Sequence, residues 1–512
     1  MRLGRTITRT LVTMVAGSGL TAMALSAQAV VQERVDLDAV AKIRDEGLNR
    51  SRLDSIVGYI TDVLGPRLTN SPANREANRW AAETFSSWGL ANVRIEPWDS
   101  TFGRGWERVS YAGRILEPFV QPLNATAMGW SGSTRGTITC PVVAIEVNDT
   151  TDLAKYTGKL KGACVMRDVP DTIGPEFEPI TRRRSLEDLL APSQPQQTPN
   201  QARQATFRQR QELNARVNQW LRTQQPAALL QQSVWTYNIL RVGGHPDGRL
   251  ARDSAYDPTP ALVVSHEHYG QLYRNVRRGI PVKLELNVRN RFFDKDRRGY
   301  NVLAEIPGTS LPNEVVMLGA HYDSWHTGTG ATDNAAGSAA MMEAVRILKT
   351  LGLPMKRTVR IALWSGEEQG LIGSRAWVRM HRDELPRISA YVNLDNGTGK
   401  IRGIWNQSNE AVTPIFEQIL FPFRDLGVVA VRHGNTGGTD HLAFDAVGVP
   451  GFNFIQDPIE YGIRSHHSNA DTYERLLIDD LEQAATVIAW TVYHIANRDE
   501  MMPRKEASAA AN

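Results

Sequence analysis

The sequence is poor in cysteine: of its 512 residues only Cys140 and Cys164 are cysteines. Two cysteines are too few for a scaffold whose fold depends on disulfides. Both lie in apolar, strand-like runs, so a disulfide between them and a pair of buried free thiols both remain open. Nothing near either residue indicates a catalytic thiol.

Long apolar runs are also absent from the rest of the chain after the N-terminal segment. A membrane-spanning helix needs about 20 apolar residues, and no later run is that long. The first residues have a different character. Three arginines precede an apolar run over residues 11–25, which glycine interrupts and which closes on Ala27-Gln28-Ala29. This pattern is typical of a secretory signal peptide rather than a membrane anchor. We therefore expect residues 1–29 to be cleaved, and the mature protein, without a membrane span, to be periplasmic or secreted.

Excess charge is the third absence. The formal net charge is +3, from 58 basic and 55 acidic residues, and the leader carries three arginines and no acid, so removing it leaves zero. A chain without a basic excess is not expected to bind nucleic acid or an anionic membrane. The run Arg182-Arg183-Arg184 is interpreted as a solvated surface cluster.

The texture of the sequence predicts a discontinuous α/β domain with an insertion. From Gly299 onward, apolar strand-like runs alternate with helical periods, which predicts a mainly parallel or mixed sheet covered by helices. We assign residues 30–125 and 291–500 to this domain and residues 126–290 to a smaller inserted domain. Within the insertion, the polar segment 192–210 is expected to be a mobile loop running into a helix. Residues 501–512 are expected to form a disordered tail.

Side chains that can bind metal follow the strand-like runs of the larger domain, where the carboxyl ends of parallel strands place reactive groups. Taken alone, each is unremarkable: an acidic pair favours a helix N-terminus, an aspartate is a common N-cap, and paired histidines are common on surfaces. These ordinary explanations do not account for finding all of these residues in order along the chain, each just after an apolar strand. The candidates are His321, Asp333, Glu367, Glu368, Asp395, His466 and His467.

Two zinc ions about 3.5–4 Å apart need several protein groups each, and one carboxylate can bridge them. Histidine, aspartate and glutamate suffice as ligands. A further carboxylate that binds no metal can take the proton from the attacking water. The adjacent Glu367 and Glu368 could supply a base and a ligand.

The motifs around these residues resemble the di-zinc aminopeptidase and carboxypeptidase family that includes glutamate carboxypeptidase and carboxypeptidase Q. The resemblance covers residues 299–495. The stretch LAKYTGKLKGACVM, residues 153–166, resembles a protease-associated domain, a frequent insert in these enzymes. The resemblance to the di-zinc peptidase family rests on the motifs GAHYDS (319–324), DNAAG (333–337), EE (367–368), NLD (393–395), HS (467–468) and DT (471–472).

This resemblance implies a role for each candidate. His321 and Asp395 would bind one zinc, Glu368 and His467 the other, and Asp333 would bridge the two. Glu367 would be the general base. A cis peptide is expected after the bridging aspartate, between Asp333 and Asn334.

Three further side chains lie in or beside these motifs. His466 occupies a position where some relatives carry a tyrosine that contacts the scissile carbonyl, so it is a candidate oxyanion stabiliser, with an ordinary loop histidine as the alternative. Asp323 could orient the imidazole of His321. His441 lies in a further motif, where a structural hydrogen bond is as good an interpretation as a catalytic role.

The predicted function is therefore an exported di-zinc exopeptidase in which a zinc-activated hydroxide attacks a peptide bond near a chain end. A serine hydrolase is excluded, because Ser365 lacks the first glycine of a G-x-S-x-G elbow. Two alternatives on the same fold stay open: a non-catalytic relative and a single-zinc enzyme such as a glutaminyl cyclase. The sequence does not decide between an aminopeptidase and a carboxypeptidase or dipeptidase, nor does it give the side-chain preference or the oligomeric state.

Overall fold

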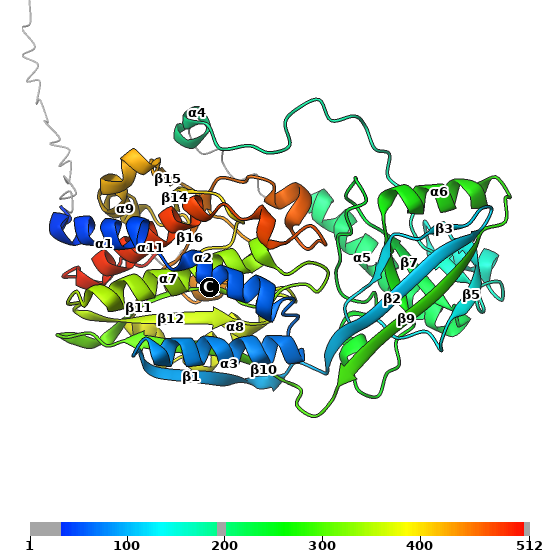
Figure 1. Ribbon diagram of the computed structural model, residues 1–512, viewed down its shortest axis with the longest axis horizontal. Coiled ribbons are helices and arrows are strands. Elements are labelled where there is room, and N and C mark those ends of the chain that lie inside the picture. The colour runs from blue at the N-terminus through cyan, green and yellow to red at the C-terminus, as the bar shows by residue number, and fades with distance from the viewer. Residues whose placement is uncertain (1–31, 192–200, 506–512) are drawn as a thin grey trace, which may run out of the picture.

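The computed structural model describes residues 32–191 and 201–505, which form two sheets, each with its own hydrophobic core (Figure 1). The predicted signal peptide lies outside the described residues. Among the described helices, none is long and apolar enough to cross a membrane.

The first sheet belongs to the larger domain. Its four central strands, β12, β11, β13 and β16, run parallel to one another, while β1 and β10 on one side and β14 on the other introduce antiparallel pairs. The predicted mixed sheet is therefore confirmed. The spatial order is β1 (Ala91–Thr101), β10 (Arg298–Ile306), β12 (Arg357–Trp364), β11 (Leu311–His321), β13 (Ile388–Asn393), β16 (Gly451–Gln456), β14 (Ile401–Trp405) and β15 (Ala430–Arg432).

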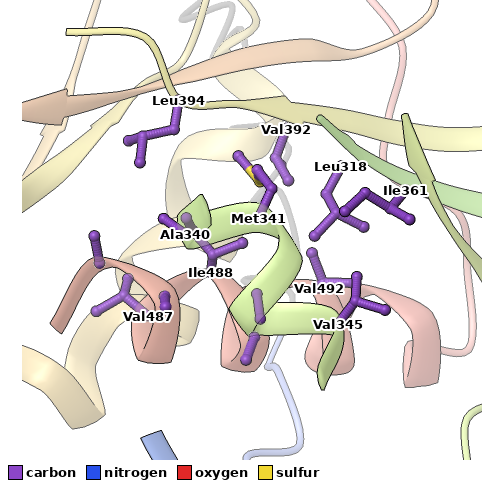
Figure 2. Close-up of a cluster of buried hydrophobic side chains, with 14 of the residues drawn as sticks. Leu318, Ala340, Met341, Val345, Ile361, Val392, Leu394, Val487, Ile488 and Val492 are labelled. Atoms are coloured by element: carbon purple, nitrogen blue, oxygen red, sulfur yellow. The ribbon is translucent and has the colours of Figure 1, made fainter. Parts of the chain in front are cut away.

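Helices bury both faces of this sheet, which explains why its central strands are apolar on both sides. On one face, Leu318 and Val392 of the sheet pack against Met341 of α7 and Ile488 of α11 (Figure 2). The helices contributing to this core are α1 (Leu37–Asn49), α2 (Leu53–Gly58), α3 (Pro72–Ser87), α7 (Ala336–Leu351), α9 (Thr413–Leu420) and α11 (Ile478–Asn497). The other face is covered by α8 (Ile372–Met380) and α10 (His441–Asp445).

The second sheet forms the inserted domain, and it begins earlier than predicted. Strand β2 pairs with β9 from Gly105 opposite Phe293 to Glu117 opposite Lys283, so the insertion spans about residues 105–293 rather than 126–290. The boundary was misplaced because β2 is joined to β9 across more than 160 residues of sequence. The order is β3 (Gln121–Pro122), β2 (Gly105–Glu117), β9 (Lys283–Phe293), β5 (Ile138–Ala144), β6 (Cys164–Met166), β7 (Ala228–Gln232), β8 (Ala261–Val264) and β4 (Ala125–Ala127), with α5 (Gln201–Gln224) and α6 (His266–Arg277) beside it.

The two cysteines are joined. Cys140 on β5 and Cys164 on β6 form a disulfide between neighbouring parallel strands, with their Cα atoms 5.6 Å apart. Of the two alternatives left open by the sequence, the structure contains the disulfide. It closes a loop within the inserted domain and lies far in sequence from the candidate metal ligands.

A strap of chain, residues 173–191, leaves the inserted domain and crosses to the larger one, where it ends in α4 (Leu186–Leu190; Figure 1). Arg182 and Arg183 on this strap are exposed, as predicted, but the arginine run also has buried partners. Arg183 Nη1 lies 2.6 Å from Asp480 and 3.1 Å from Asp457, whose side chain is fully buried. The main-chain N–H of Arg184 also donates to Asp457. The run is therefore an anchor between domains, which its local sequence could not show because both acids are more than 270 residues away.

The expected tail is also partly wrong. Met502 is 2% exposed, and its N–H donates to Ser389 Oγ at 3.0 Å. Arg504 donates to the carbonyl of Gly448 at 2.7 Å. Residues 501–505 thus pack against the larger domain, and residues 506–512 lie outside the described part of the chain.

Candidate metal centre

The candidate ligands meet at the carboxyl ends of the central parallel strands. His321 is the last residue of β11, Glu367 and Glu368 follow β12, and Asp395 follows β13. The histidine pair follows β16 by a longer loop that includes the turn Tyr461–Ser465. Because these strands are adjacent and parallel, their ends present all of these side chains at one edge.

His321 is oriented by the main chain rather than by the carboxylate of Asp323. Its Nδ1 lies 3.0 Å from the carbonyl oxygen of Asp323 and 3.7 Å from the carboxylate. A carbonyl only accepts, so Nδ1 carries the proton and Nε2 points the other way. Nε2 lies 3.2 Å from Asp333 Oδ1 and 3.4 Å from Asp395 Oδ1. The carboxylate of Asp323 instead accepts from Thr69 Oγ1 at 2.7 Å.

Asp333 lies between the two halves of the centre. Its Oδ1 faces His321, and its Oδ2 faces His467 Nε2 at 3.4 Å. The peptide bond to Asn334 is cis, as the family resemblance implied. Asp471 holds this segment by accepting from the N–H groups of Thr332 and Asp333 at 2.6 and 3.2 Å. The two carboxylate oxygens of Asp333 therefore face different candidate ligands, Oδ1 facing His321 and Oδ2 facing His467.

His467 and Glu368 form the other half. His467 Nε2 lies 2.8 Å from Glu368 Oε2, whose side chain is 1% exposed. The neighbouring His466 has its Nε2 at 3.8 Å from Asp333 Oδ2, and its ring lies beside that of His467, tilted by 32° with centroids 3.7 Å apart. Of the two histidines, only His467 contacts both acidic candidates. Its contacts favour it as the ligand, while His466 remains within reach of the same aspartate.

The candidate donor atoms suit zinc. Histidine nitrogens and carboxylate oxygens suit zinc, and two groups of such atoms, His321/Asp333/Asp395 and Asp333/His466/His467, each lie within 4.8 Å of one another. Two carboxylate oxygens, Asp333 Oδ2 and Glu368 Oε1, are buried and receive no hydrogen bond from the described residues. Buried, unpaired carboxylate oxygens are costly unless a cation neutralises them.

Electrostatics give the same indication. Burial raises the pKa of Glu368 well above its usual range, and the nearby Asp333 raises it further. Burial likewise raises the pKa of Glu367, with Asp395 and Asp440 adding to the rise and His321 opposing it. Bound dications would reverse this logic, because they favour ionised carboxylates. The site is therefore a buried, acid-rich cluster of side chains suited to cations.

Supporting side chains hold the loops of the centre. Arg67, fully buried, donates to the carbonyls of Tyr322, Thr329 and Gly330 and so joins the end of β11 to the glycine-rich loop. Asp440 accepts from Ser374 and has its second oxygen buried without a partner among the described residues. Burial raises the pKa of Asp440 to about 7.

Two other histidines have structural contacts. His441 Nε2 lies 3.1 Å from the carbonyl of Thr436, as in the structural alternative for this residue. His326, which no motif placed, is buried with its Nε2 2.7 Å from the carbonyl of Ala127 in the inserted domain. Neither belongs to a group of candidate ligands among the described residues.

The sequence did not point to two residues beside the centre. The hydroxyl of Tyr461 donates to Asp333 Oδ1 at 3.1 Å and lies 3.4 Å from Asp395 Oδ1. Arg241, from the inserted domain, has its Nη2 3.4 Å from His467 Nδ1. No local pattern marks either one. The main-chain pairing of Arg241 with Ser468 and the bond from Val242 N–H to the carbonyl of His467 bring the inserted domain onto the histidine loop.

Comparison with known proteins agrees with this geometry. Residues 301–492 match the model of peptidase family M28. Mouse carboxypeptidase Q is 27% identical over 467 residues, which cover 91% of this chain and 90% of that protein. The crystal structure of a peptidase M28 precursor from Shewanella amazonensis has a TM-score of 0.69 at 25% identity, covering 92% of this chain and 99% of that one.

A zinc aminopeptidase from Bacillus subtilis shares the fold, with a TM-score of 0.58 at 18% identity over 89% of this chain and 97% of that one. The predicted fold class and the predicted peptidase class are thereby confirmed. The match of residues 301–492 to peptidase family M28 thus agrees with the strand order of the larger domain and with the residues at its strand ends.

Proposed function

We propose that this protein is an exopeptidase with two zinc ions, and that it hydrolyses peptide bonds at a chain terminus. His321 and Asp395 would hold one ion, Glu368 and His467 the other, and Asp333 both. The observation that carries this is the position of Asp333, whose two carboxylate oxygens face different groups of ligands. The zinc aminopeptidase among the structural neighbours is consistent with the metal.

When bound, the zinc ions would polarise the scissile carbonyl and lower the pKa of a water molecule. Glu367 then acts as the general base: its carboxylate takes the proton from the attacking water and delivers it to the leaving amine. Asp323, which accepts from the N–H of Glu367 at 3.3 Å, holds the main chain of that base. His466 is proposed as a neutral donor to the carbonyl oxygen, since burial lowers its pKa to about 4.

The position of Arg241 favours cleavage next to a free carboxylate, as in a carboxypeptidase or dipeptidase. Its guanidinium lies beside His467 and over the ring of Trp235, and no carboxylate among the described residues pairs with it. A fixed guanidinium beside the reacting centre suits a carboxylate, which it can bind through two parallel hydrogen bonds. An aminopeptidase would need a carboxylate there for the substrate's amine.

A panel of dipeptides and tripeptides blocked separately at each terminus tests both parts of this function. We expect the mature protein to hold about two zinc ions per chain, to lose activity on chelation, and to cleave peptides with a free carboxylate much faster than amidated ones. Full activity without metal would contradict the zinc mechanism. One zinc per chain would favour the single-zinc alternative, and two zinc ions without hydrolysis would favour the non-catalytic one.

Arg241→Met, with Arg241→Lys as the charge-preserving control, tests the recognition of the carboxylate. Losing a charge-assisted hydrogen bond worth about 1.5–3 kcal/mol should raise KM roughly 10- to 100-fold for free peptides. Peptides amidated at the C-terminus should be indifferent to the change. An equal effect on both kinds of peptide would contradict the assignment.

We also propose that the inserted domain is a protease-associated domain and that the protein is exported after removal of residues 1–29. The insertion's mixed sheet and its contacts with the histidine loop support the first. N-terminal sequencing of protein secreted by a bacterial host tests the second, with a mature start near residue 30 as the expected result.

A further inference from the structure

His467 has a backbone conformation that is uncommon for a residue with a side chain. Its φ is +62°, in the left-handed region. Such a conformation persists where the surrounding structure determines it, and it is often found at functional sites. The contacts of the loop that carries His467 therefore decide where its imidazole points.

The inserted domain contacts this loop through a short segment, residues 240–242. The N–H of Val242 donates to the carbonyl of His467 at 2.8 Å. Between these residues and Asn469, Arg241 and Ser468 form an antiparallel bridge. The main chain on both sides of the His467 peptide is thus paired with the inserted domain, although His467 itself belongs to the larger domain.

Asn469 completes this pairing with its side chain. Its Oδ1 accepts the N–H of Leu240 at 2.7 Å, and its own N–H donates to the carbonyl of Leu240 at 3.2 Å. Leu240 is buried in the core of the inserted domain, whereas Asn469 is exposed. Two reciprocal bonds to one buried residue therefore fix the loop two positions after His467.

The segment that receives the loop is itself fixed to the inserted sheet. Ser233, which follows β7, is fully buried and donates to the carbonyl of Ile239 at 2.6 Å. The same hydroxyl accepts the N–H of Arg241 at 3.1 Å, and the N–H of Ser233 donates to Val264 at the end of β8 at 2.8 Å. The pairing thus connects the histidine loop to two strands of the inserted domain.

The imidazole of His467 also has a neighbour that rests on the inserted domain. The ring of Trp325 meets that of His467 at 60°, with centroids 5.9 Å apart. The indole packs against Trp130 of the inserted domain and against Gly129, where an added Cβ would lie only 2.9 Å from it. The inserted domain therefore constrains His467 through its main chain and, through Trp325, through its ring.

We propose that the inserted domain holds His467 in its metal-binding position, with Asn469 as the positioning residue, and so sets the affinity for the zinc ion that His467 and Glu368 would bind. Groups that orient a metal-binding histidine change metal affinity about 10- to 100-fold when they are removed. The other ion should be unaffected, because His321 and Asp395 follow strands of the larger sheet. This inference rests on the proposed two-zinc function.

The test compares two substitutions at Asn469 with one elsewhere. Asn469→Leu keeps a similar volume and removes the acceptor, whereas Asn469→Asp retains an acceptor oxygen. Asn497→Leu is the matched control, because Asn497 Oδ1 accepts a main-chain N–H, that of Lys356, at 3.0 Å near the end of α11.

Each full-length protein would be titrated with a chelator of known zinc affinity, and the zinc retained would be counted by plasma mass spectrometry. Visible absorption of the cobalt-substituted proteins would report the coordination of the ions. Thermal unfolding of the metal-free proteins would report the fold, and hydrolysis of one dipeptide would be measured with and without added zinc.

We expect Asn469→Leu to bind one of its two zinc ions about 10- to 100-fold more weakly, with the other unchanged. Added zinc should restore its kcat, because the ligands and the base are all present. Asn469→Asp should have nearly the affinities of the wild type. Asn497→Leu should keep both affinities even where its unfolding temperature falls.

Unchanged affinity for both ions in Asn469→Leu would overturn the proposal, and so would equal weakening of both. The same loss of zinc in Asn497→Leu would also overturn it, because the measurement would then follow the stability of the fold. A wild-type protein that binds two zinc ions and cleaves no peptide would refute the peptidase function but leave the positioning role intact. One zinc ion in the wild type would overturn both.

Discussion

The neighbouring carboxylates Glu367 and Glu368 offer the sharpest test of the proposed centre. The same change from glutamate to glutamine should affect the rate at Glu367, the proposed base, and the zinc content at Glu368, the proposed ligand. Changing either to glutamine keeps its shape and removes its charge. Glu368 Oε2 lies 2.8 Å from His467 Nε2 in a side chain that is 1% exposed, so Glu368→Gln removes a first donor to one ion and should lower zinc to about one per chain. Glu367 has no comparable contact with a histidine among the described residues, and neither glutamate belongs to the two groups of three candidate ligands.

The expected loss for Glu367→Gln follows from its role in moving a proton. General base catalysis contributes about 10²- to 10⁴-fold, which corresponds to about 3–5 kcal/mol in activation free energy. This variant should keep both zinc ions and its unfolding temperature. Zinc measured by plasma mass spectrometry and single-turnover hydrolysis of one dipeptide provide the two readouts.

Glu474→Gln is the matched control, since Glu474 is exposed. If Glu367→Gln loses zinc and Glu368→Gln keeps it, the roles of the pair are reversed. If both variants keep zinc and rate, neither carboxylate has the function assigned to it, and the mechanism fails.

Three further predictions concern the histidine pair and the two cross-links of the fold. His467→Ala should lower zinc occupancy, whereas His466→Ala should keep both ions and lose about 10²- to 10³-fold in rate if it is a donor, or only a few-fold if it is a loop histidine; metal loss on His466→Ala alone would show that the neighbours were assigned in the wrong order. Replacing Cys140 and Cys164 by serine should cost about 3 kcal/mol of unfolding free energy, because the disulfide closes a loop with a sequence separation of 24, and chemical denaturation with and without reductant measures this. Arg183→Met should cost only about 1 kcal/mol, since the arginine is 46% exposed and solvent screens its ion pairs, and faster proteolysis of the strap with unchanged zinc content would show that the anchor acts between domains.

The fold class and the identity of the candidate ligands could be derived from the sequence because both depend on local patterns. An apolar run followed at once by His321, or by Glu367 and Glu368, places those side chains at a strand end whatever the rest of the chain does. The alternation of strands and helices then brings the ends of parallel strands to one edge. The cis peptide between Asp333 and Asn334 was expected from the family resemblance alone, and the structure contains it.

Tertiary structure decided what local patterns cannot encode. Arg241 reaches His467 across 226 residues, and Arg183 reaches Asp480 across 297, so no window of sequence contains both partners. The arginine run is exposed at Arg182 and Arg183, as predicted, but its contacts with the larger domain could not be predicted for that reason. Nothing in the local sequence distinguishes Tyr461 from other aromatic residues. Its position beside Asp333 depends on the turn Tyr461–Ser465, which directs its hydroxyl at that carboxylate.

The domain boundary shows the same division. The sequence analysis assigned residues 30–125 to the larger domain, but the pairing of β2 (Gly105–Glu117) with β9 places this strand in the inserted sheet. Strand formation is governed by neighbouring residues, whereas strand pairing is governed by which surfaces can be buried together. The sequence thus determined which residues could do chemistry, and only the packing of the two domains decided which others stand beside them.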